Sequence, residues 1–377
     1  MDDSTVYFSD LRTSPRRNLL DKVAALLDHA GVADRIHRGD LVAVKLHFGE
    51  RGNASFIRPV FVRRVVERLR DLGARPCLTD TNTLYTGSRS EAATHLQTAI
   101  RNGFAYAVVD APVVIADGLR GNSSVAVPIT GGNHFQQVHI AAEIANADAI
   151  VVLSHFKGHD LAGIGGALKN LGMGCAARGG KLAQHSSVAP KVKSKRCIAC
   201  GECLRWCAAG AIELGDKARI DPKTCVGCGE CIPTCPQDAI QVQWTEGPQV
   251  MQEKMAEYAC GALAGKTDRC VFLNAVTQVS PACDCHGHND APIVGDLGYL
   301  AASDPVALDQ ASADLVNRQP GNPASALKAN HAPGEDKFRG VYPNIDWTVQ
   351  LARAAALGLG NRRYLLENVS GGIRAPA

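Results

Sequence analysis

Eight of the fourteen cysteines lie between positions 197 and 235 of the 377-residue chain, in two runs with the same spacing. Within each run the four cysteines are separated by two, two and three residues, and Pro236 follows the second run. Thiolates at these intervals are typical of a pair of [4Fe–4S] clusters, in which the last cysteine of each run binds the cluster of the other run. The first cluster would then use Cys197, Cys200, Cys203 and Cys235, and the second Cys225, Cys228, Cys231 and Cys207.

The spacing argues against the main alternative, a pair of zinc sites, because zinc ribbons use two Cys-x2-Cys pairs that are well separated in sequence. Ala208 stands where the second run has Pro236, a departure that removes no ligand. The segment repeats with a period of 28 residues and resembles a bacterial two-cluster ferredoxin. We therefore expect a ferredoxin-type module at residues 194–244, between two flanking parts at residues 1–193 and 245–377.

Short apolar runs and helical patterns alternate on both sides of this module. Residues 41–46, 75–79, 112–116, 149–153 and 270–276 are predicted as strands, and a final apolar run covers 364–369. Residues 58–72, 90–102, 252–263, 305–316 and 347–357 are predicted as helices. This order favours one α/β domain, a mostly parallel sheet with crossover helices, interrupted by the inserted module. The alternative is a string of three separate domains.

Polar side chains follow three of the predicted strands, at the edge where open parallel sheets bind ligands. They are Lys45, His47, Glu50 and Arg51 after the first strand, Asp80, Asn82 and Tyr85 after the second, and Ser154, His155, Lys157, His159 and Asp160 after the fourth. Three histidines and two lysines that converge on one edge predict a functional pocket. The candidate catalytic residues are Lys45, His47, Asp80, His155, His159 and Lys169.

A glycine-rich stretch leads from the last of these strands into a predicted helix. Gly163, Gly165 and Gly166 precede Lys169, and a helix N-terminus approached by glycines is a site for phosphate or carboxylate groups. The third glycine is misplaced for a dinucleotide-binding fingerprint. We therefore expect these three glycines and Lys169 to contact an anionic substrate or a cofactor of another kind.

Five strings in the chain resemble those of a widespread, uncharacterised family of iron–sulfur-centre proteins, a domain of unknown function. The strings are Lys45-Leu-His47-Phe-Gly-Glu50, Thr79-Asp80-Thr-Asn82-Thr-Leu-Tyr85, Ser154-His155-Phe-Lys157-Gly-His159, Gly166-Ala-Leu-Lys169-Asn-Leu-Gly172-Met-Gly174 and Cys283-Asp-Cys285. The resemblance runs nearly the whole length, including the ferredoxin-type insert. It implies a fold but no reaction.

The segment His159-x2-Ala162-Gly163-x-Gly165-Gly166-x2-Lys169 is also similar to the active-site segment of lactate racemases. That family tethers a nickel-pincer nucleotide through a lysine, and a histidine completes the nickel coordination. The resemblance implies that His159 is an acid/base, Lys169 a cofactor tether or anion clamp, and His185 a metal ligand. The second acid/base histidine of the racemases is missing here, where the chain has Asp80, Asn82 and Tyr85. Racemisation needs a proton acceptor on each face of the carbon, so the resemblance extends to the pocket and not to the reaction.

Cys283 and Cys285 form a candidate third metal site, next to His286 and His288. Thiolates and imidazoles together suit zinc, nickel or iron. In an extended segment the cysteines would share one face and the histidines the other, so that binding of one ion needs a turn. The alternatives are a redox thiol pair and a cysteine-lined loop that packs on the ferredoxin-type module. The remaining four cysteines, which are predicted to be buried, are Cys77, Cys175, Cys260 and Cys270.

The composition excludes two classes of partner. Charged residues make up 20% of the chain, aromatic residues 5%, and the net charge is only +3, with no basic stripe for nucleic acid. No window approaches the ~18 consecutive apolar residues of a membrane span. Arg16-Arg17 resembles a twin-arginine export signal, but Asp21, Lys22 and Asp28 interrupt the apolar stretch that should follow. We expect a cytoplasmic protein with an ordinary helix at 16–30, whose cysteines bind metals or act as thiols.

These features together predict an iron–sulfur oxidoreductase. Electrons from a soluble carrier of the ferredoxin or flavodoxin type would pass through two [4Fe–4S] clusters to the pocket. The pocket would bind a small anionic substrate, with or without a further metal or nucleotide-type cofactor. Two alternatives are a non-catalytic electron carrier or maturation scaffold, and a nickel-pincer-type isomerase with accessory clusters.

Overall fold

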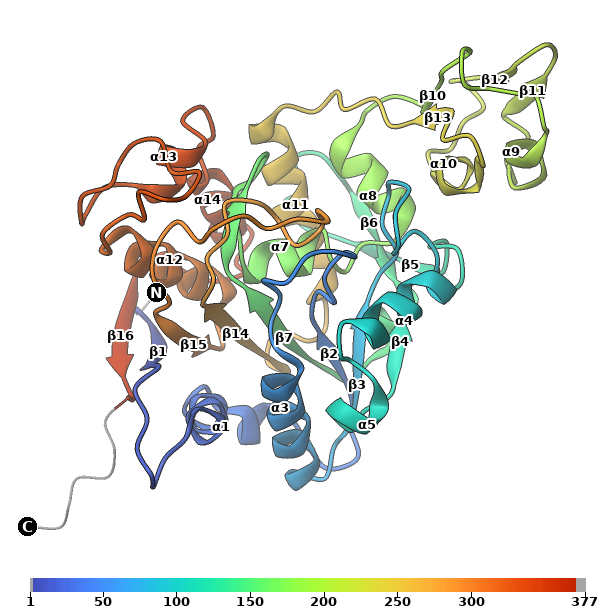
Figure 1. Cartoon of the computed structure of the whole chain (residues 1–377). Helices are drawn as coiled ribbons and strands as arrows, with labels where there is room; N and C mark the ends of the chain where they lie inside the picture. Colours follow the sequence, from blue (N-terminus) through green and yellow to red (C-terminus); the bar gives the residue numbers. More distant parts are fainter. Residues whose placement is uncertain (1–2, 371–377) are drawn as a thin grey trace, which may run out of the picture.

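A computed structural model describes residues 3–370, in which an eight-stranded sheet is covered by helices on both faces (Figure 1). All neighbouring strands pair in parallel except β15, which runs opposite to β1 and β14. In spatial order the strands are β16 (Tyr364–Asn368), β1 (Ser4–Asp10), β15 (Gly298–Ala302), β14 (Cys270–Val276), β7 (Ala149–His155), β2 (Leu41–Lys45), β3 (Arg75–Asp80) and β4 (Val113–Ile115). The prediction of a mostly parallel α/β sheet is confirmed.

Alternate residues of the central strands point to opposite faces of the sheet, and each face has its own core. In β7, Ile150 and Val152 pack in one apolar cluster, whereas Val151 and Leu153 pack in the other. Strands buried on both faces read as continuous apolar runs, which explains why the sequence pattern reveals them. The helices of the two faces are α1 (Leu19–His29), α3 (Pro59–Asp71), α4 (Ala92–Arg101) and α5 (Tyr106–Val109) on one, and α7 (Ala167–Gly172), α11 (Pro248–Ala262), α12 (Pro305–Asn317) and α14 (Thr348–Ala356) on the other.

Helix α3 illustrates how the sequence forms these layers. Phe61, Val62, Val65, Val66 and Leu69 recur at helical spacing and are all buried against the sheet. Each such side chain contributes roughly 1.5–3 kcal/mol when fully buried. Shorter elements complete the fold: α2 (Val32–Arg35), α6 (Ala142–Asn146), α8 (Arg178–His185), α13 (Lys337–Val341), and the two-stranded pairs β5 (Ser124–Pro128) with β6 (Gln137–Ala141) and β8 (Lys157–His159) with β9 (Gly163–Gly165).

Strands from both sides of the cysteine-rich segment share this one sheet. β14 follows the segment in sequence and pairs with β7, which precedes it. β1 lies between β15 and β16, both from the C-terminal part of the chain. The sequence patterns missed β1 and β15. β1 mixes polar and apolar residues, and β15 contains Gly298 and small alanines that give no clear strand signal.

The cysteine-rich segment forms a small body beside α8, at the upper right of Figure 1. Its elements are β10 (Lys191–Val192), α9 (Glu202–Arg205), β11 (Ile212–Leu214), β12 (Ala218–Ile220), α10 (Cys231–Thr234) and β13 (Ile240–Gln241). β10 and β13 pair where the chain enters and leaves, and β11 pairs with β12. Within residues 3–370, no helix has the length and apolar character needed to cross a membrane.

Candidate functional site

A cavity of about 600 Å³ lies at the carboxyl ends of β2, β3 and β7. The predicted residues that line it are Lys45, His47, Asp80, Tyr85, Ser154, His155, Lys157, His159, Asp160, Gly166, Lys169, His185, Cys283 and Cys285. Parallel strands end at the same edge, and this is why side chains from three separate segments converge. All six candidate catalytic residues share one cavity. Gly163 and Gly165 are not among the residues that line it.

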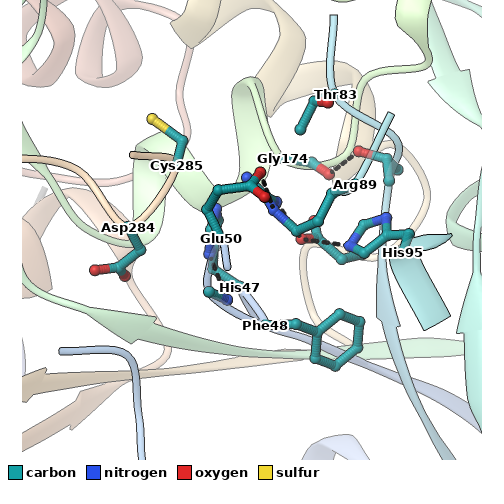
Figure 2. Close-up of polar contacts among 12 residues, drawn as sticks. His47, Phe48, Glu50, Thr83, Arg89, His95, Gly174, Asp284 and Cys285 are labelled. Carbon is teal, nitrogen blue, oxygen red and sulfur yellow. Dashed lines mark hydrogen bonds and ion pairs between the residues drawn. The ribbon is translucent and has the colours of Figure 1, made fainter. Parts of the chain in front are cut away.

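A buried network of ion pairs forms one wall of the cavity. Asp80 receives Lys45 Nζ at 2.9 Å and Arg89 Nη1 at 3.4 Å, and Arg89 Nε lies 3.2 Å from Glu50 Oε2. Figure 2 shows Glu50 and Arg89 pointing toward each other, with His95 beside them. Burial alone would raise the pKa of Asp80, but Lys45 and His95 hold it well below its ordinary value. The wall is therefore a set of fixed charges.

His47 lies in the same wall and is neutral at ordinary pH. Burial, followed by the nearby Arg89 guanidinium, lowers the pKa of His47 well below its usual value. Its Nδ1 accepts the backbone N–H of Gly49 at 2.9 Å, which leaves the proton of the neutral ring on Nε2. His47 can therefore donate a hydrogen bond into the cavity.

His155 is held by oxygen atoms on both sides of its ring. Nδ1 lies 2.9 Å from Asp284 Oδ1, and Nε2 lies 3.0 Å from the carbonyl oxygen of Thr277. Only a doubly protonated ring can donate to both. Lys157 Nζ lies 3.2 Å from Asp284 Oδ2, so this fully buried carboxylate contacts both Lys157 and His155. His155 thus anchors the Asp284 turn and is poorly placed to exchange protons with a substrate.

His159 and Lys169 meet at Cys283. Lys169 Nζ lies 3.3 Å from Cys283 Sγ, and a ligand atom of His159 lies within 4.8 Å of both the Cys283 and Cys285 sulfurs. Burial alone would lower the pKa of Lys169, but the Cys283 sulfur raises it above its ordinary value. Burial, and then the Lys169 charge, lower the pKa of His159. The two pocket segments and the Cys-x-Cys segment therefore form one site.

His185 enters the cavity from the end of α8, where its ring packs edge-on against Trp244 with centroids 4.8 Å apart. Burial lowers the pKa of His185 to about 3. A neutral imidazole in this position can accept a hydrogen bond or bind a metal.

Because the unfolded chain protonates His185 near its ordinary pKa and the folded chain does not, the folded state should lose stability as the pH falls from about 6.5 toward about 3. His185→Gln should flatten this acid limb. The measurement is the urea midpoint of unfolding, followed from about pH 7 down to about pH 4. An equally steep limb in the variant would contradict the prediction.

The glycine-rich stretch has a different role from the predicted one. The backbone N–H groups of Ala167 and Leu168, at the start of α7, donate to Asp309 at 2.8 and 2.9 Å. The anion at this helix end is thus a carboxylate of the chain itself. Gly166 leaves room for Asp309, and Gly163 has φ +71° and lies against Trp347, where a side chain would clash. Gly163 and Gly166 thus allow close packing around α7, and Gly166 also lines the cavity.

Among the residues of the site that were not predicted from the sequence are the charged Arg89, Lys181 and Asp284. Lys181 Nζ lines the cavity and donates to the carbonyl of Ala176 at 2.7 Å, and burial lowers the pKa of Lys181 to about 8. Arg89 follows the Thr79–Tyr85 string closely, and Asp284 lies between two predicted ligands. Both lie in or just after segments already identified, so their closeness in sequence to predicted site residues was the available signal. Lys181 had none.

In the cysteine-rich body, two small hollows each collect four cysteines. One is lined by Cys197, Cys200, Cys203 and Cys235, and the other by Cys207, Cys225, Cys228 and Cys231. These are the sets that crossed ligation requires. Backbone N–H groups point at several sulfurs, among them Ala211 N at 3.2 Å from Cys207 Sγ and Ala239 N at 3.2 Å from Cys235 Sγ. Such donors are typical around cluster-bound sulfur.

The cysteine-rich body touches the wall of the cavity directly. Leu84 lines the cavity and also belongs to the apolar cluster that holds Cys197, Cys203 and Ile232. Trp244, at the exit of the body, lines the cavity as well. The apolar cluster of the cysteine-rich body therefore extends to the wall of the cavity.

Comparison with known proteins gives a likeness to a solved structure and a match to a protein family. The apoprotein of lactate racemase from Thermoanaerobacterium thermosaccharolyticum is 11% identical, with a TM-score of 0.38, over 85% of this chain and 58% of that one. The chain thus spans little more than half of the racemase's length, and a likeness at this level supports no conclusion about function. No curated protein matches the chain.

Residues 42–314 match the family described as Domain of unknown function (DUF362). The match covers well over half of the chain and includes the strand ends that form the cavity, the cysteine-rich body and the Cys283–Cys285 turn. The expectation of an uncharacterised family, drawn from the five strings, is confirmed. The chain is a member of this family.

Proposed function

We propose that this protein is an iron–sulfur oxidoreductase that delivers electrons to a small anionic substrate in the cavity. The observation that carries the proposal is the contact between the body that holds the two four-cysteine hollows and a charged cavity, since Leu84 lines the cavity and packs in the apolar cluster of that body. Bound [4Fe–4S] clusters would supply one-electron transfer. The eight cysteines of the two runs would hold them, in the crossed sets that line the hollows.

The charge of the cavity favours an anionic ligand. Its wall carries five cationic side chains, Lys45, Arg89, Lys157, Lys169 and Lys181, and three acidic ones, Asp80, Asp160 and Glu246. Asp80 is already neutralised by Lys45 and Arg89. Three of the other cations are also paired, Arg89 with Glu50, Lys157 with Asp284 and Lys169 with Cys283. Lys181 has no ion-pair partner among residues 3–370, so it is the cation available to a carboxylate, phosphate or similar group.

The exposed part of the cysteine-rich body suits contact with an electron donor. Cys200 is exposed, and the large apolar side chains of Ile198 and Val226 are 60% and 74% exposed. We propose that a soluble carrier of the ferredoxin or flavodoxin type binds here. Electrons would then cross from the outer face to the hollow beside α8, where Cys228 lies against Gly179, and on to the cavity.

A nickel-pincer isomerase is the second candidate, because His159, Lys169 and His185 line the same cavity with the spacing of the racemase segment. The contact of Lys169 with Cys283 weighs against a tethered cofactor. An amine that reacts must first lose its proton, and the sulfur keeps this lysine charged. An adduct on Lys169 in the intact mass of the denatured protein would favour the isomerase.

The experiment is anaerobic purification followed by iron analysis and reduction. We expect about eight irons per chain, and bleaching of the visible absorption on addition of reduced ferredoxin. A panel of small anionic oxidants, with 2-oxo carboxylates, nitrite, sulfite and glutathione disulfide among them, then tests reoxidation. With the oxidant that works, Lys181→Met should slow reoxidation about tenfold or more at unchanged iron content, since a hydrogen bond to a charged group is lost.

Lys223→Gln, an exposed change on the cysteine-rich body, is the matched control and should leave both readings unchanged. Protein that binds no iron under anaerobic conditions would overturn the proposal. So would clusters that reoxidise equally fast in the wild type and in Lys181→Met.

A further inference from the structure

The Cys283–Cys285 segment is a rigid turn that presents two sulfurs to the cavity. His286 N donates to the carbonyl oxygen of Cys283 at 3.0 Å, which closes the turn. Between the cysteines, the buried Asp284 carboxylate binds Ser55 Oγ at 3.1 Å as well as His155 and Lys157. Tyr85 donates its hydroxyl to the carbonyl of Cys285 at 2.9 Å. The segment is therefore held at both its carboxylate and its backbone.

Cys283 Sγ lies in a cluster of donors. Lys169 Nζ is 3.3 Å away, and the backbone N–H of Cys285 points at it from 3.5 Å. The Cys285 thiol and the Lys169 ammonium hold the pKa of Cys283 well below that of an ordinary thiol, although burial opposes them. The same pairing raises the pKa of Cys285. Cys283 Sγ, which the Lys169 ammonium and the backbone N–H of Cys285 both face, is the sulfur better stabilised as a thiolate.

The state of the His159 ring favours thiolate chemistry over a metal site. His159 Nδ1 accepts backbone N–H groups from Leu161 and Ala162, both at 3.1 Å. A neutral ring must then carry its proton on Nε2. A doubly protonated ring, whose Nδ1 would pair with Asp160, also carries a proton on Nε2. A ring nitrogen that carries a proton cannot bind a metal, and metal-binding histidines donate from their other nitrogen. Two sulfurs alone are too few for zinc.

The cavity gives small molecules a route to this pair. Cys283 and Cys285 both line it, together with the exposed residues Asp160, Trp244 and His286. The two sulfurs are therefore accessible to a small molecule that enters the cavity, but not to the surface of another protein. The neighbouring cations favour ligands that carry negative charge.

We propose that Cys283 and Cys285 form a redox-active dithiol that reduces a small anionic disulfide, with Cys283 as the attacking thiolate and Cys285 as the resolving thiol. This inference rests on the proposed function, and it names the substrate class of the same cavity. Lys169 stabilises the thiolate. His159 lies beside it as a hydrogen-bond donor.

The chemistry balances in three steps. Cys283 Sγ attacks one sulfur of the substrate disulfide, so that a bond forms between them and the second sulfur leaves as a thiolate. Cys285 gives its proton to that thiolate and attacks Cys283 Sγ, which releases the first sulfur and closes a Cys283–Cys285 disulfide. Two electrons, one at a time from the carrier through the cluster sites, and one proton from solvent restore the Cys283 thiolate and the Cys285 thiol, and a second solvent proton converts the released thiolate to a thiol. The carrier is oxidised and the substrate disulfide is reduced to two thiols.

The test uses the full chain, purified anaerobically, with glutathione disulfide as the probe. Cys285→Ser should trap a stable glutathione adduct, and peptide mapping should place it on Cys283. Cys283→Ser should form no adduct at Cys285. Cys260→Ser, a change on α11 away from the cavity, is the control and should release two thiols per disulfide as the wild type does.

A second measurement follows the rate at which iodoacetamide alkylates Cys283 as a function of pH. Its midpoint should lie below that of an ordinary thiol, and Lys169→Met should raise it by about one pH unit or more, since one paired charge is lost. The Met side chain keeps most of the bulk of the lysine. A variant that failed to fold would lose its iron, which distinguishes a folding defect from a shift of the alkylation midpoint.

The inference and the proposed function fail in different ways. Clusters present without an adduct, or a Cys283 protected by stoichiometric zinc or nickel, would overturn the dithiol and leave the iron–sulfur proposal standing. An adduct on Cys283 in protein that holds no iron would support the dithiol pair and overturn the electron route. Equal alkylation of Cys283 and Cys260 across the pH range would also overturn the inference.

Discussion

Replacement of Asp80 by alanine should lower the free energy of unfolding by about 3–5 kcal/mol, because it leaves the buried Lys45 ammonium without a charged partner. Asp80 is 3% exposed and pairs with Lys45 at 2.9 Å and Arg89 at 3.4 Å, both almost fully buried. Without it, Lys45 keeps the oxygens of Asn170 and Leu46 but, among residues 3–370, no ion-pair partner. The cost reflects the stranded charge of Lys45 rather than the strength of either ion pair, because Arg89 keeps its ion pair with Glu50.

Denaturant unfolding of the purified protein measures this effect, with Asp28→Ala as the matched control. Asp28 pairs with Arg68 at 2.7 Å on the surface, where both side chains are partly solvated. A surface pair of this kind contributes about 0–1 kcal/mol. If Asp80→Ala cost no more than Asp28→Ala, the cavity wall would have to be wet and flexible, and the fixed-charge description of the site would be wrong.

The sheet could be predicted because its central strands are buried on both faces and stand between helices of clear periodicity. The predicted strand 270–276 coincides with β14, and the predicted helix 305–316 lies within α12 (Pro305–Asn317). The convergence of Lys45, Asp80 and His155 follows from parallel strands alone, since each residue stands at the end of its strand. That part of the site needed no knowledge of long-range contacts.

The partners that decide the chemistry could not be predicted in this way. Cys283 reaches Lys169 from 114 positions away, and Asp309 reaches the start of α7 from 142 positions away. No periodicity or spacing specifies such contacts, because they depend on how the loops after β14 and the face of α12 pack. The glycine-rich stretch was therefore interpreted as an anion site, when the protein itself supplies the anion. A redox thiol pair was one alternative to a metal site at Cys283 and Cys285, and the contact of Cys283 with Lys169 that favours it is not visible in the sequence.

Serine replacements of the cluster cysteines should remove iron in a pattern that reports which cysteines work together. A [4Fe–4S] cluster bound by four cysteines should be lost, or become too labile to purify, when one of them is replaced. Each single variant, such as Cys197→Ser or Cys207→Ser, should therefore fall from about eight irons to about four. The double variants discriminate between the two ways in which the runs could share their cysteines.

Crossed ligation makes a specific prediction for these doubles, since Cys235 lines the hollow of the first run and Cys207 that of the second. Cys197→Ser with Cys235→Ser should lose no more iron than either single variant, because both residues serve one cluster. Cys197→Ser with Cys207→Ser should lose nearly all of it. Iron and sulfide analysis gives the result, and circular dichroism checks that the sheet stays folded. If the first pair lost all iron and the second kept half, each run would hold its own cluster, and the arrangement of the two hollows would not reflect ligation.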